Sequence, residues 1–176
     1  MRTNEEKQQG ILAYAWVVDF PLFEKTDRGG WTYSHNPFTG PRPEDEEKLR
    51  TGIDIGSIIS LQYDLVCNGY EAGGGGIRIH KAELLKKVFE IIGRSPENIE
   101  KEFGHMLRAL RFGTPPHGGI GIGLERAIML FTDEEYIREV QAFPMTSGGR
   151  TAVMDAPSEG SRAQLDELGL ELKKKK

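Results

Sequence analysis

Charged side chains in this sequence lie beside glycine runs, and their types suit the binding of phosphate and carboxylate groups. The stretch EAGGGGIR places four consecutive glycines between Glu71 and Arg78. Ordered glycines lose much backbone entropy and offer no side chain to pack. The stretch is therefore either a flexible linker or a bare floor on which something flat and charged can lie.

A second glycine-rich stretch, GGIGIGLER, predicts a strand followed by a helix. In such a strand Ile120 and Ile122 lie on one face, while Gly121 and Gly123 lie on the other. We expect the isoleucine side to pack on the core and the glycine side to admit a planar ring. Arg126 falls in the first helical turn, where free N–H groups favour a phosphate. The alternative is that the glycines only permit close packing and Arg126 is a surface residue.

Neither of the two familiar nucleotide-binding loops is present. No glycine loop is followed by lysine and then serine or threonine, and no G-x-G-x-x-G unit has a ribose-binding acid downstream. A transition-metal site is not expected, because His80 and His117 lack a third ligand at zinc-like spacing. A nucleotide, if one binds, is predicted to bind on an antiparallel sheet.

Composition predicts a single domain without a strong charge field. The 176 residues are 38% hydrophobic and carry a net charge of −4, so any nucleic-acid partner must be held by a local patch or by other parts of a larger assembly. One cysteine cannot form an internal disulfide, and no apolar run is long enough for a membrane span. We therefore expect a cytoplasmic protein without a membrane partner, and a solvated tail at Lys173–Lys176.

The strand predictions rest on short apolar runs between turn residues. Residues Leu12–Val18 predict a buried strand, and Trp31–Tyr33 is a candidate for its partner. Residues Ile58–Cys67 and Gly76–His80 predict two antiparallel strands joined by a loop that contains the glycines. The prolines and acids of Asn36–Lys48 indicate a surface loop that ends in a short helix.

The helix predictions rest on apolar periodicity and capping residues. Residues Lys81–Ile92 show helical spacing, and a second helix begins with Ser95 as its cap and Pro96 at its first position. The sequence TPPHGG predicts a loop, and Leu124–Phe131 predicts a third helix. We expect Trp16 and Cys67 in the core. The fold class is therefore predicted to be α+β, a mostly antiparallel sheet flanked by helices.

The motif GIGIGLER resembles the third signature motif of class II aminoacyl-tRNA synthetases. The chain as a whole is similar to the C-terminal half of the catalytic domain of bacterial-type aspartyl-tRNA synthetases, in the ordered motifs WVVDFPLFE, HNPFT, YDLVCNGYEAGGGGIRIH, RFGTPPHGGIGIGLERAIML and AFPMT. The similarity spans residues 14–172, between a polar segment at 1–13 and the lysine tail at 173–176. It implies a partial class II synthetase catalytic fold.

The resemblance assigns the amino-acid side of the site. It implies that Arg78 grips the side-chain carboxylate of L-aspartate, and a guanidinium fork matches a carboxylate better than an amide. The alternative for Arg78 is a structural salt bridge on a strand. His35 matches the first of two adjacent histidines in a loop near the substrate, and Asn36 stands in place of the second. This departure removes one possible cation.

The resemblance also assigns the nucleotide side. It implies that Glu71 holds Mg²⁺ on the ATP phosphates, since a hard cation needs only one or two protein carboxylates. Gly123, Leu124, Glu125 and Arg126 match the ATP-contacting end of the third motif, and Arg126 is expected to stack near adenine and reach the terminal phosphate. Glu125 stands where the family often has aspartate, and Gly76 where it often has serine.

The implied activity is aspartate–tRNA ligation, by activation of L-aspartate with ATP and transfer to tRNA. Such catalysis is mostly positioning and charge neutralisation, so no general base is needed. The family's first two motifs and its anticodon-binding barrel have no counterpart here. We therefore expect a fragment that cannot aminoacylate tRNA alone, and that needs the remainder of a homodimeric synthetase. The alternatives are a repurposed aspartyl-adenylate-forming enzyme and a non-catalytic binding module.

Overall fold

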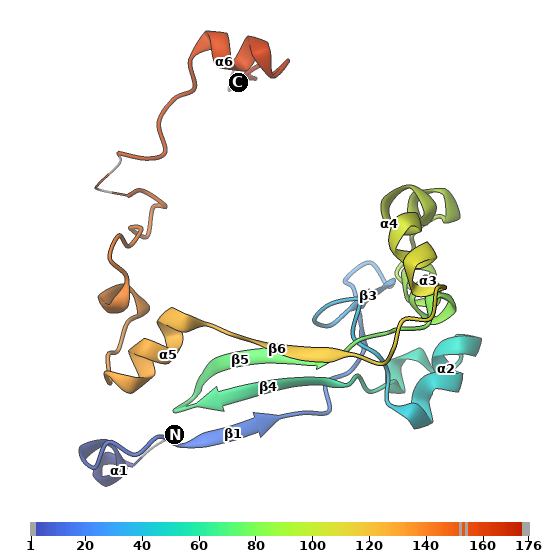
Figure 1. The fold of residues 1–176 in the computed structure, drawn as a ribbon, viewed down its shortest axis with the longest axis horizontal. Helices are drawn as coiled ribbons and strands as arrows, with labels where there is room; N and C mark the ends of the chain where they lie inside the picture. The colour runs from blue at the N-terminus through green and yellow to red at the C-terminus, as the bar shows by residue number, and fades with distance from the viewer. Residues whose placement is uncertain (1–2, 152, 154, 174–176) are drawn as a thin grey trace.

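The centre of the molecule is a four-stranded antiparallel sheet. The computed structural model describes residues 3–151, 153 and 155–173. Its sheet has the strand order β1-β4-β5-β6, with β1 at Tyr14–Val17, β4 at Gln62–Cys67, β5 at Tyr70–Ile77 and β6 at Gly118–Ile122 (Figure 1). A separate hairpin pairs β2 at Phe23–Lys25 with β3 at Trp31–Tyr33. The predicted α+β class with a mostly antiparallel sheet is confirmed.

The helices gather at the two ends of the sheet. The α-helices are α1 (Asn4–Gln8), α2 (Glu46–Thr51), α3 (Ala82–Ile91), α4 (Pro96–Leu110), α5 (Leu124–Phe131) and α6 (Arg162–Glu167). Three short 3-10 turns occur among the described residues: η1 (Pro43–Asp45), η2 (Ile55–Ser57) and η3 (Ile137–Val140). Helices α2, α3 and α4 lie at one end of the sheet and α5 at the other, while the segment leading to α6 extends away (Figure 1). None of the described helices is long and apolar enough to cross a membrane.

The predicted helices and their caps are confirmed. The Ser95 hydroxyl accepts a hydrogen bond from the Asn98 N–H at 3.3 Å, and Pro96 is the first residue of α4. The larger core lies where α3 packs on α4, and Phe89 stacks on Phe103 with ring centroids 4.2 Å apart. A smaller core joins the sheet to α5 and consists of Cys67, Ala72, Met129 and Leu130. The prediction that Cys67 is buried is therefore right.

Two predictions about the first strand are wrong. Strand β1 is exposed along its length, and Trp16 is 59% exposed instead of buried. Residues Trp31–Tyr33 pair with β2 instead of with β1. Because Pro21 follows the first strand closely, the polar turn at 26–30 joins two strands that both come after this proline. The lone partner of β1 among the described strands is β4, so its side chains gain little cover.

The glycine run is part of a strand and not a loop, contrary to the prediction. Strand β5 contains all four glycines, and the hairpin turn is formed by Asn68 and Gly69. Both turn residues have positive φ, 54° and 92°. A two-residue turn of this kind matches the right-handed twist of paired strands, and Asn-Gly is its usual sequence. The sequence signal for the hairpin was therefore Asn68-Gly69, two residues before Glu71.

The loop predicted at residues 36–48 is partly buried and is held by Asp45. The side chain of Asp45 is 8% exposed, its Oδ2 accepts from the Ile59 N–H at 3.0 Å, and its Oδ1 lies 2.7 Å from Lys48 Nζ. The hydrogen bond with Lys48 and the one from Ile59 lower the pKa of Asp45 below 3.8. The ionised carboxylate therefore ties this loop to the residues that precede β4.

Replacing this carboxylate should weaken the fold and its response to acid. A group whose pKa is lowered by folding stabilises the protein above its unfolded pKa of 3.8, and this contribution disappears as the pH falls through the lower folded value. Asp45→Asn should lower the free energy of unfolding at neutral pH by about 1–3 kcal/mol. It should also flatten the loss of stability below about pH 4. Urea denaturation across pH measures both effects. The exposed Glu44→Gln is the control, and an Asp45→Asn profile parallel to the wild-type profile would contradict this role.

Candidate functional site

The two faces of the central sheet carry different side chains. Gly74 of β5 pairs with Asp64 of β4 and with Gly121 of β6. Paired residues in antiparallel strands point to the same face of the sheet. We call the face to which these three residues point the glycine face. It carries Gln62, Asp64, Gly74, Gly76, Gly119 and Gly121. The opposite side, the isoleucine face, carries Tyr63, Leu65, Ile120 and Ile122.

Contrary to the prediction, the isoleucine face packs on a core only in part: Leu65 packs against the smaller core at α5, but the two isoleucines stay largely exposed. Ile120 is 40% exposed and Ile122 is 62% exposed. Trp16 of β1 meets Tyr63 of β4 edge to face on the same side, with ring centroids 5.9 Å apart. The described residues thus leave an apolar strip open along this face.

A β-bulge decides which face Glu71 occupies. Glu71 and Arg78 are seven residues apart, so in a regular strand they would point to opposite faces. Leu65 is opposite Gly73 but Val66 is opposite Glu71, which leaves Ala72 as an extra residue in β5. The extra residue reverses the alternation beyond it. Glu71 therefore joins the glycine face.

Two carboxylates flank Gly74 on this face. A Cβ built on Gly74 would lie 2.9 Å from Asp64 Oδ1 and 2.9 Å from Glu71 Oε1. Gln62 Nε2 donates to the same Oδ1 of Asp64 at 2.9 Å, which holds this carboxylate in place. The space left by the missing Cβ is thus lined by two hard oxygen donors, the ligands that Mg²⁺ prefers. No group of three or more His, Cys, Asp or Glu that could hold a metal ion occurs among the described residues, so the remaining ligands would be phosphate or water oxygens.

Asp64 is a candidate site residue that the sequence reasoning missed. Nothing in its local sequence distinguishes it from other acids. Its pairing with Gly74 can be predicted once Asn68-Gly69 is recognised as the turn, because a two-residue turn fixes the register of β4 against β5. The bulge, which has no clear sequence signal, then brings Glu71 to the same side.

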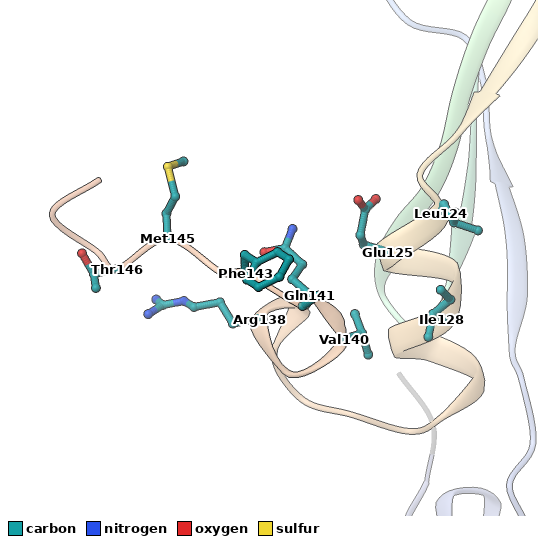
Figure 2. Close-up of a pocket in the computed structure, with 10 residues that line it drawn as sticks. Leu124, Glu125, Ile128, Arg138, Val140, Gln141, Phe143, Met145 and Thr146 are labelled. Atoms are coloured by element: carbon teal, nitrogen blue, oxygen red, sulfur yellow. The ribbon is translucent and has the colours of Figure 1, made fainter. Parts of the chain in front are cut away.

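Arg126 lies at the carboxylate end of the site. Its Nη1 donates to the backbone carbonyl of Glu71 at 2.5 Å, and the Gly123 N–H donates to the Ala72 carbonyl at 3.3 Å. These two contacts attach the start of α5 to the bulged part of β5. Leu124 and Glu125 face elsewhere and line a cavity of about 760 Å³ between α5 and residues 138–146 (Figure 2). Of the residues predicted to contact ATP, Gly123 and Arg126 therefore contact β5, whereas Leu124 and Glu125 face this cavity instead.

Arg78 lies just beyond the other end of β5. Its N–H donates to the His117 carbonyl at 2.8 Å, and its Nη1 donates to Asn36 Oδ1 at 3.1 Å. Arg78 forms no ion pair with any described residue. The alternative of a structural salt bridge thus finds no support. His35 is exposed and makes no hydrogen bond to Arg78 within the described part of the chain.

The two charged ends are joined by the glycine-rich strand β5. Glu71 and Arg78 lie seven residues apart in the sequence, which corresponds to roughly 20 Å in an extended chain. Between them Gly74 presents no side chain on the glycine face, whereas Gly76 is buried under Thr39, whose Cγ2 would lie 2.9 Å from an added Cβ. The arrangement is an elongated surface with carboxylates and Arg126 at one end and Arg78 at the other. It is not the tight loop expected from the sequence, yet it could hold a long, flat, charged molecule.

Comparisons with known proteins identify the family of the chain. The family model described as tRNA synthetases class II (D, K and N) matches residues 1–147. An aspartate–tRNA(Asp/Asn) ligase of Phenylobacterium zucineum is 46% identical over 93% of this chain, and one of Chlorobium luteolum is 48% identical over 92%. The match covers 28% and 26% of those two proteins. The chain thus spans about a quarter of the length of these relatives.

Solved structures share the fold. The aspartyl-tRNA synthetase of Entamoeba histolytica aligns over 74% of this chain and 22% of its own, with a TM-score of 0.54 and 29% identity. The asparaginyl-tRNA synthetase of Pyrococcus horikoshii aligns over 76% of this chain and 26% of its own, with a TM-score of 0.56. Its 22% identity is a likeness of fold alone. With the family model matching most of its length, the chain belongs to the class II tRNA synthetases of the D, K and N group.

Proposed function

We propose that this chain provides the aspartate-binding and part of the ATP-binding surface of an aspartate–tRNA ligase. The observation that carries the proposal is the bulge at Ala72, which places Glu71 on the same face as Asp64, Gly74 and Arg78. One flat surface then has an anion-binding end and a cation-binding end. Aspartate and the phosphates of ATP need these two chemistries side by side.

Each end has a defined role. Arg78 binds the side-chain carboxylate of L-aspartate through the guanidinium donors that Asn36 leaves free, and the exposed His35 lies in the adjoining loop. Arg126 binds a phosphate of ATP, and the backbone of Gly123, Leu124 and Glu125 lies beside the nucleotide, while the side chains of Leu124 and Glu125 line the separate cavity against residues 138–146. The bare backbone at Gly74 lets the flat parts of the ligand approach the sheet closely.

Asp64 and Glu71 would hold Mg²⁺ at the phosphate end. The two carboxylates fit this ion because they provide hard oxygen donors around the space at Gly74. Bound there, Mg²⁺ would neutralise phosphate charge. Gln62 donates to Asp64 and keeps one oxygen oriented toward that space.

The reaction needs positioning more than acid–base chemistry. An oxygen of the aspartate α-carboxylate attacks the α-phosphorus of ATP, the bond to the bridging oxygen breaks, and pyrophosphate leaves with that electron pair. A terminal hydroxyl of tRNA then attacks the acyl carbon and releases AMP. In this chain Arg78 fixes the amino acid and Arg126 offsets phosphate charge, which is the contribution expected where catalysis is electrostatic.

The remainder of a synthetase is the proposed partner. The relatives are about four times longer than the matched segment, and the isoleucine face is an open apolar strip. Large exposed apolar surfaces mark interaction sites. We propose that the rest of the catalytic domain covers this face, and that tRNA binding and any homodimer contact belong to the larger assembly.

Calorimetric titration with ATP tests the nucleotide end. The wild-type chain should bind ATP more tightly when Mg²⁺ is present. Arg126→Ala should weaken ATP binding about tenfold or more with and without Mg²⁺, because a charged hydrogen bond to phosphate is lost. Glu71→Gln should instead remove the Mg²⁺-dependent gain.

The control for charge is Arg162→Ala on α6. Arg162 pairs with Asp166 at 3.0 Å and its side chain is 71% exposed, so its loss should leave ATP binding unchanged. Equal ATP affinity of the wild-type chain, Arg126→Ala and Arg162→Ala, or no ATP binding at all, would refute the proposed nucleotide surface.

A further inference from the structure

The side-chain oxygen of Asn36 accepts hydrogen bonds from two elements. Its Oδ1 accepts from the backbone N–H groups of Phe38 at 2.9 Å and Thr39 at 3.1 Å, and from the Thr39 hydroxyl at 3.2 Å. It also accepts from Arg78 Nη1 at 3.1 Å. The first three bonds close the loop after His35 in the way that asparagine often closes a turn. The fourth bond ties this loop to the guanidinium.

The hydrogen bond from Arg78 to Asn36 orients the guanidinium without neutralising its positive charge. Asn36 is partly buried, and Thr39 beside it is 2% exposed, so this loop forms a fixed support. The acceptor is a neutral amide, and no described carboxylate pairs with Arg78. A guanidinium has five donors in a planar fork, so one bond to Asn36 fixes the plane and leaves donors for a ligand. Its positive charge stays available.

An acid at position 36 would have the opposite effect. Aspartate has nearly the shape of asparagine, and its carboxylate could accept the same four hydrogen bonds. It would also pair with Arg78 and compensate the guanidinium charge. A carboxylate ligand would then lose its attraction to Arg78, whereas a neutral amide ligand would lose much less.

We propose that Asn36 is a positioning residue that orients Arg78 for a carboxylate, and that its neutrality makes the site prefer L-aspartate over L-asparagine. The identity of the ligand rests on the proposed function. The orienting role rests on the contacts alone. Asn36 thus has a role of its own, at the position where the resemblance implies the second of two histidines.

Nuclear magnetic resonance of the arginine guanidinium groups tests both halves on the full chain. The Arg78 signals are identified with Arg78→Lys. Without ligand, rotation of the Arg78 guanidinium should be slow in the wild-type chain and in Asn36→Asp, and fast in Asn36→Ala. Equally slow rotation in Asn36→Ala would overturn the orienting role.

Titration with L-aspartate and L-asparagine then tests selectivity. L-Aspartate should shift the Arg78 signal of the wild-type chain, and Asn36→Asp should weaken this binding about tenfold or more with a much smaller effect on L-asparagine. The control Asn98→Asp makes the same charge change at an exposed position of α4 and should bind L-aspartate like the wild-type chain.

Different results would overturn the role of Asn36 and the proposed aspartate site. Wild-type affinity for L-aspartate in Asn36→Asp would overturn the selectivity role, since a purely structural asparagine tolerates this replacement. A wild-type chain whose Arg78 is held but does not respond to L-aspartate would overturn the proposed aspartate site and the selectivity role together. The orienting role would stand on the rotation measurement.

Discussion

Gly75→Ala should destabilise the central sheet more than any other glycine replacement in β5. A Cβ at Gly75 would overlap the carbonyl oxygen of Gly119 and lie 2.8 Å from Tyr63 Cε2 and 2.9 Å from Ile120 Cα. Two of these three atoms are backbone, so they cannot move without opening the pairing of β5 with β6. We expect the free energy of unfolding to fall by about 3 kcal/mol, at the upper end for overpacking. Urea denaturation of the purified chain measures this change.

Gly119→Ala is the matched control. Gly119 is the β6 residue whose carbonyl would be struck, yet no heavy atom lies within 4 Å of a Cβ built on it. Its replacement should change the free energy of unfolding by less than about 1 kcal/mol. If Gly75→Ala were as stable as Gly119→Ala, β5 and β6 could not be paired as closely as the structure shows.

Gly74→Ala should have the opposite effect to Gly75→Ala: the fold should stay stable, but the binding of Mg²⁺ should be weakened. The atoms that a Cβ at Gly74 would meet are Asp64 Oδ1 and Glu71 Oε1, both at 2.9 Å. These are ends of side chains that can move, Asp64 at the cost of its hydrogen bond from Gln62, so the fold should survive. The methyl group would fill the space between the two carboxylates. We expect the Mg²⁺-dependent gain in ATP affinity to fall about tenfold or more in calorimetric titration.

Gly121→Ala provides the comparison on the same face. Gly121 pairs with Gly74 across β5 and β6, and a Cβ there meets only the Gly74 carbonyl oxygen, at 3.9 Å. It should keep the Mg²⁺-dependent gain. A Gly74→Ala chain that retains the full gain would show that the ion is not held between Asp64 and Glu71.

The helical part of the fold could be predicted because its signals are local. Ser95 and Pro96 mark the start of α4 within two residues, and the apolar spacing of α3 gives its buried face directly. The predicted helix at Leu124–Phe131 is found at the same residues. Capping and periodicity need no knowledge of distant partners, which is why these elements are found where expected.

The strands were harder to predict because their pairing and burial depend on segments that are distant in sequence. A run such as that around Trp16 shows that a strand is apolar, but burial depends on what covers it, and here Trp16 is 59% exposed. The glycine run suggested a loop because glycine is rare inside strands. The actual turn had a clear signal in Asn68-Gly69, and reading it would have moved the glycines into β5.

The candidate site could be predicted only in part. The motifs identified Glu71, Arg78 and Arg126 as residues with suitable chemistry, but spacing alone places Glu71 and Arg78 on opposite faces. The bulge at Ala72 that corrects this is a long-range feature of strand register. Asp64 and Asn36 were missed as contributors for the same reason, since each acts through a neighbour that is distant in sequence.

The most direct test of the proposed surface is to locate a bound divalent ion on it. Mn²⁺ can replace Mg²⁺ with ATP, and its unpaired electrons broaden the nuclear resonances of nearby residues. We predict the strongest broadening at Asp64, Glu71 and Gly74, with weaker broadening toward Gly121. Broadening centred on the acidic run Asp133–Glu135 next to α5, or broadening without a centre on the glycine face, would contradict the proposed site.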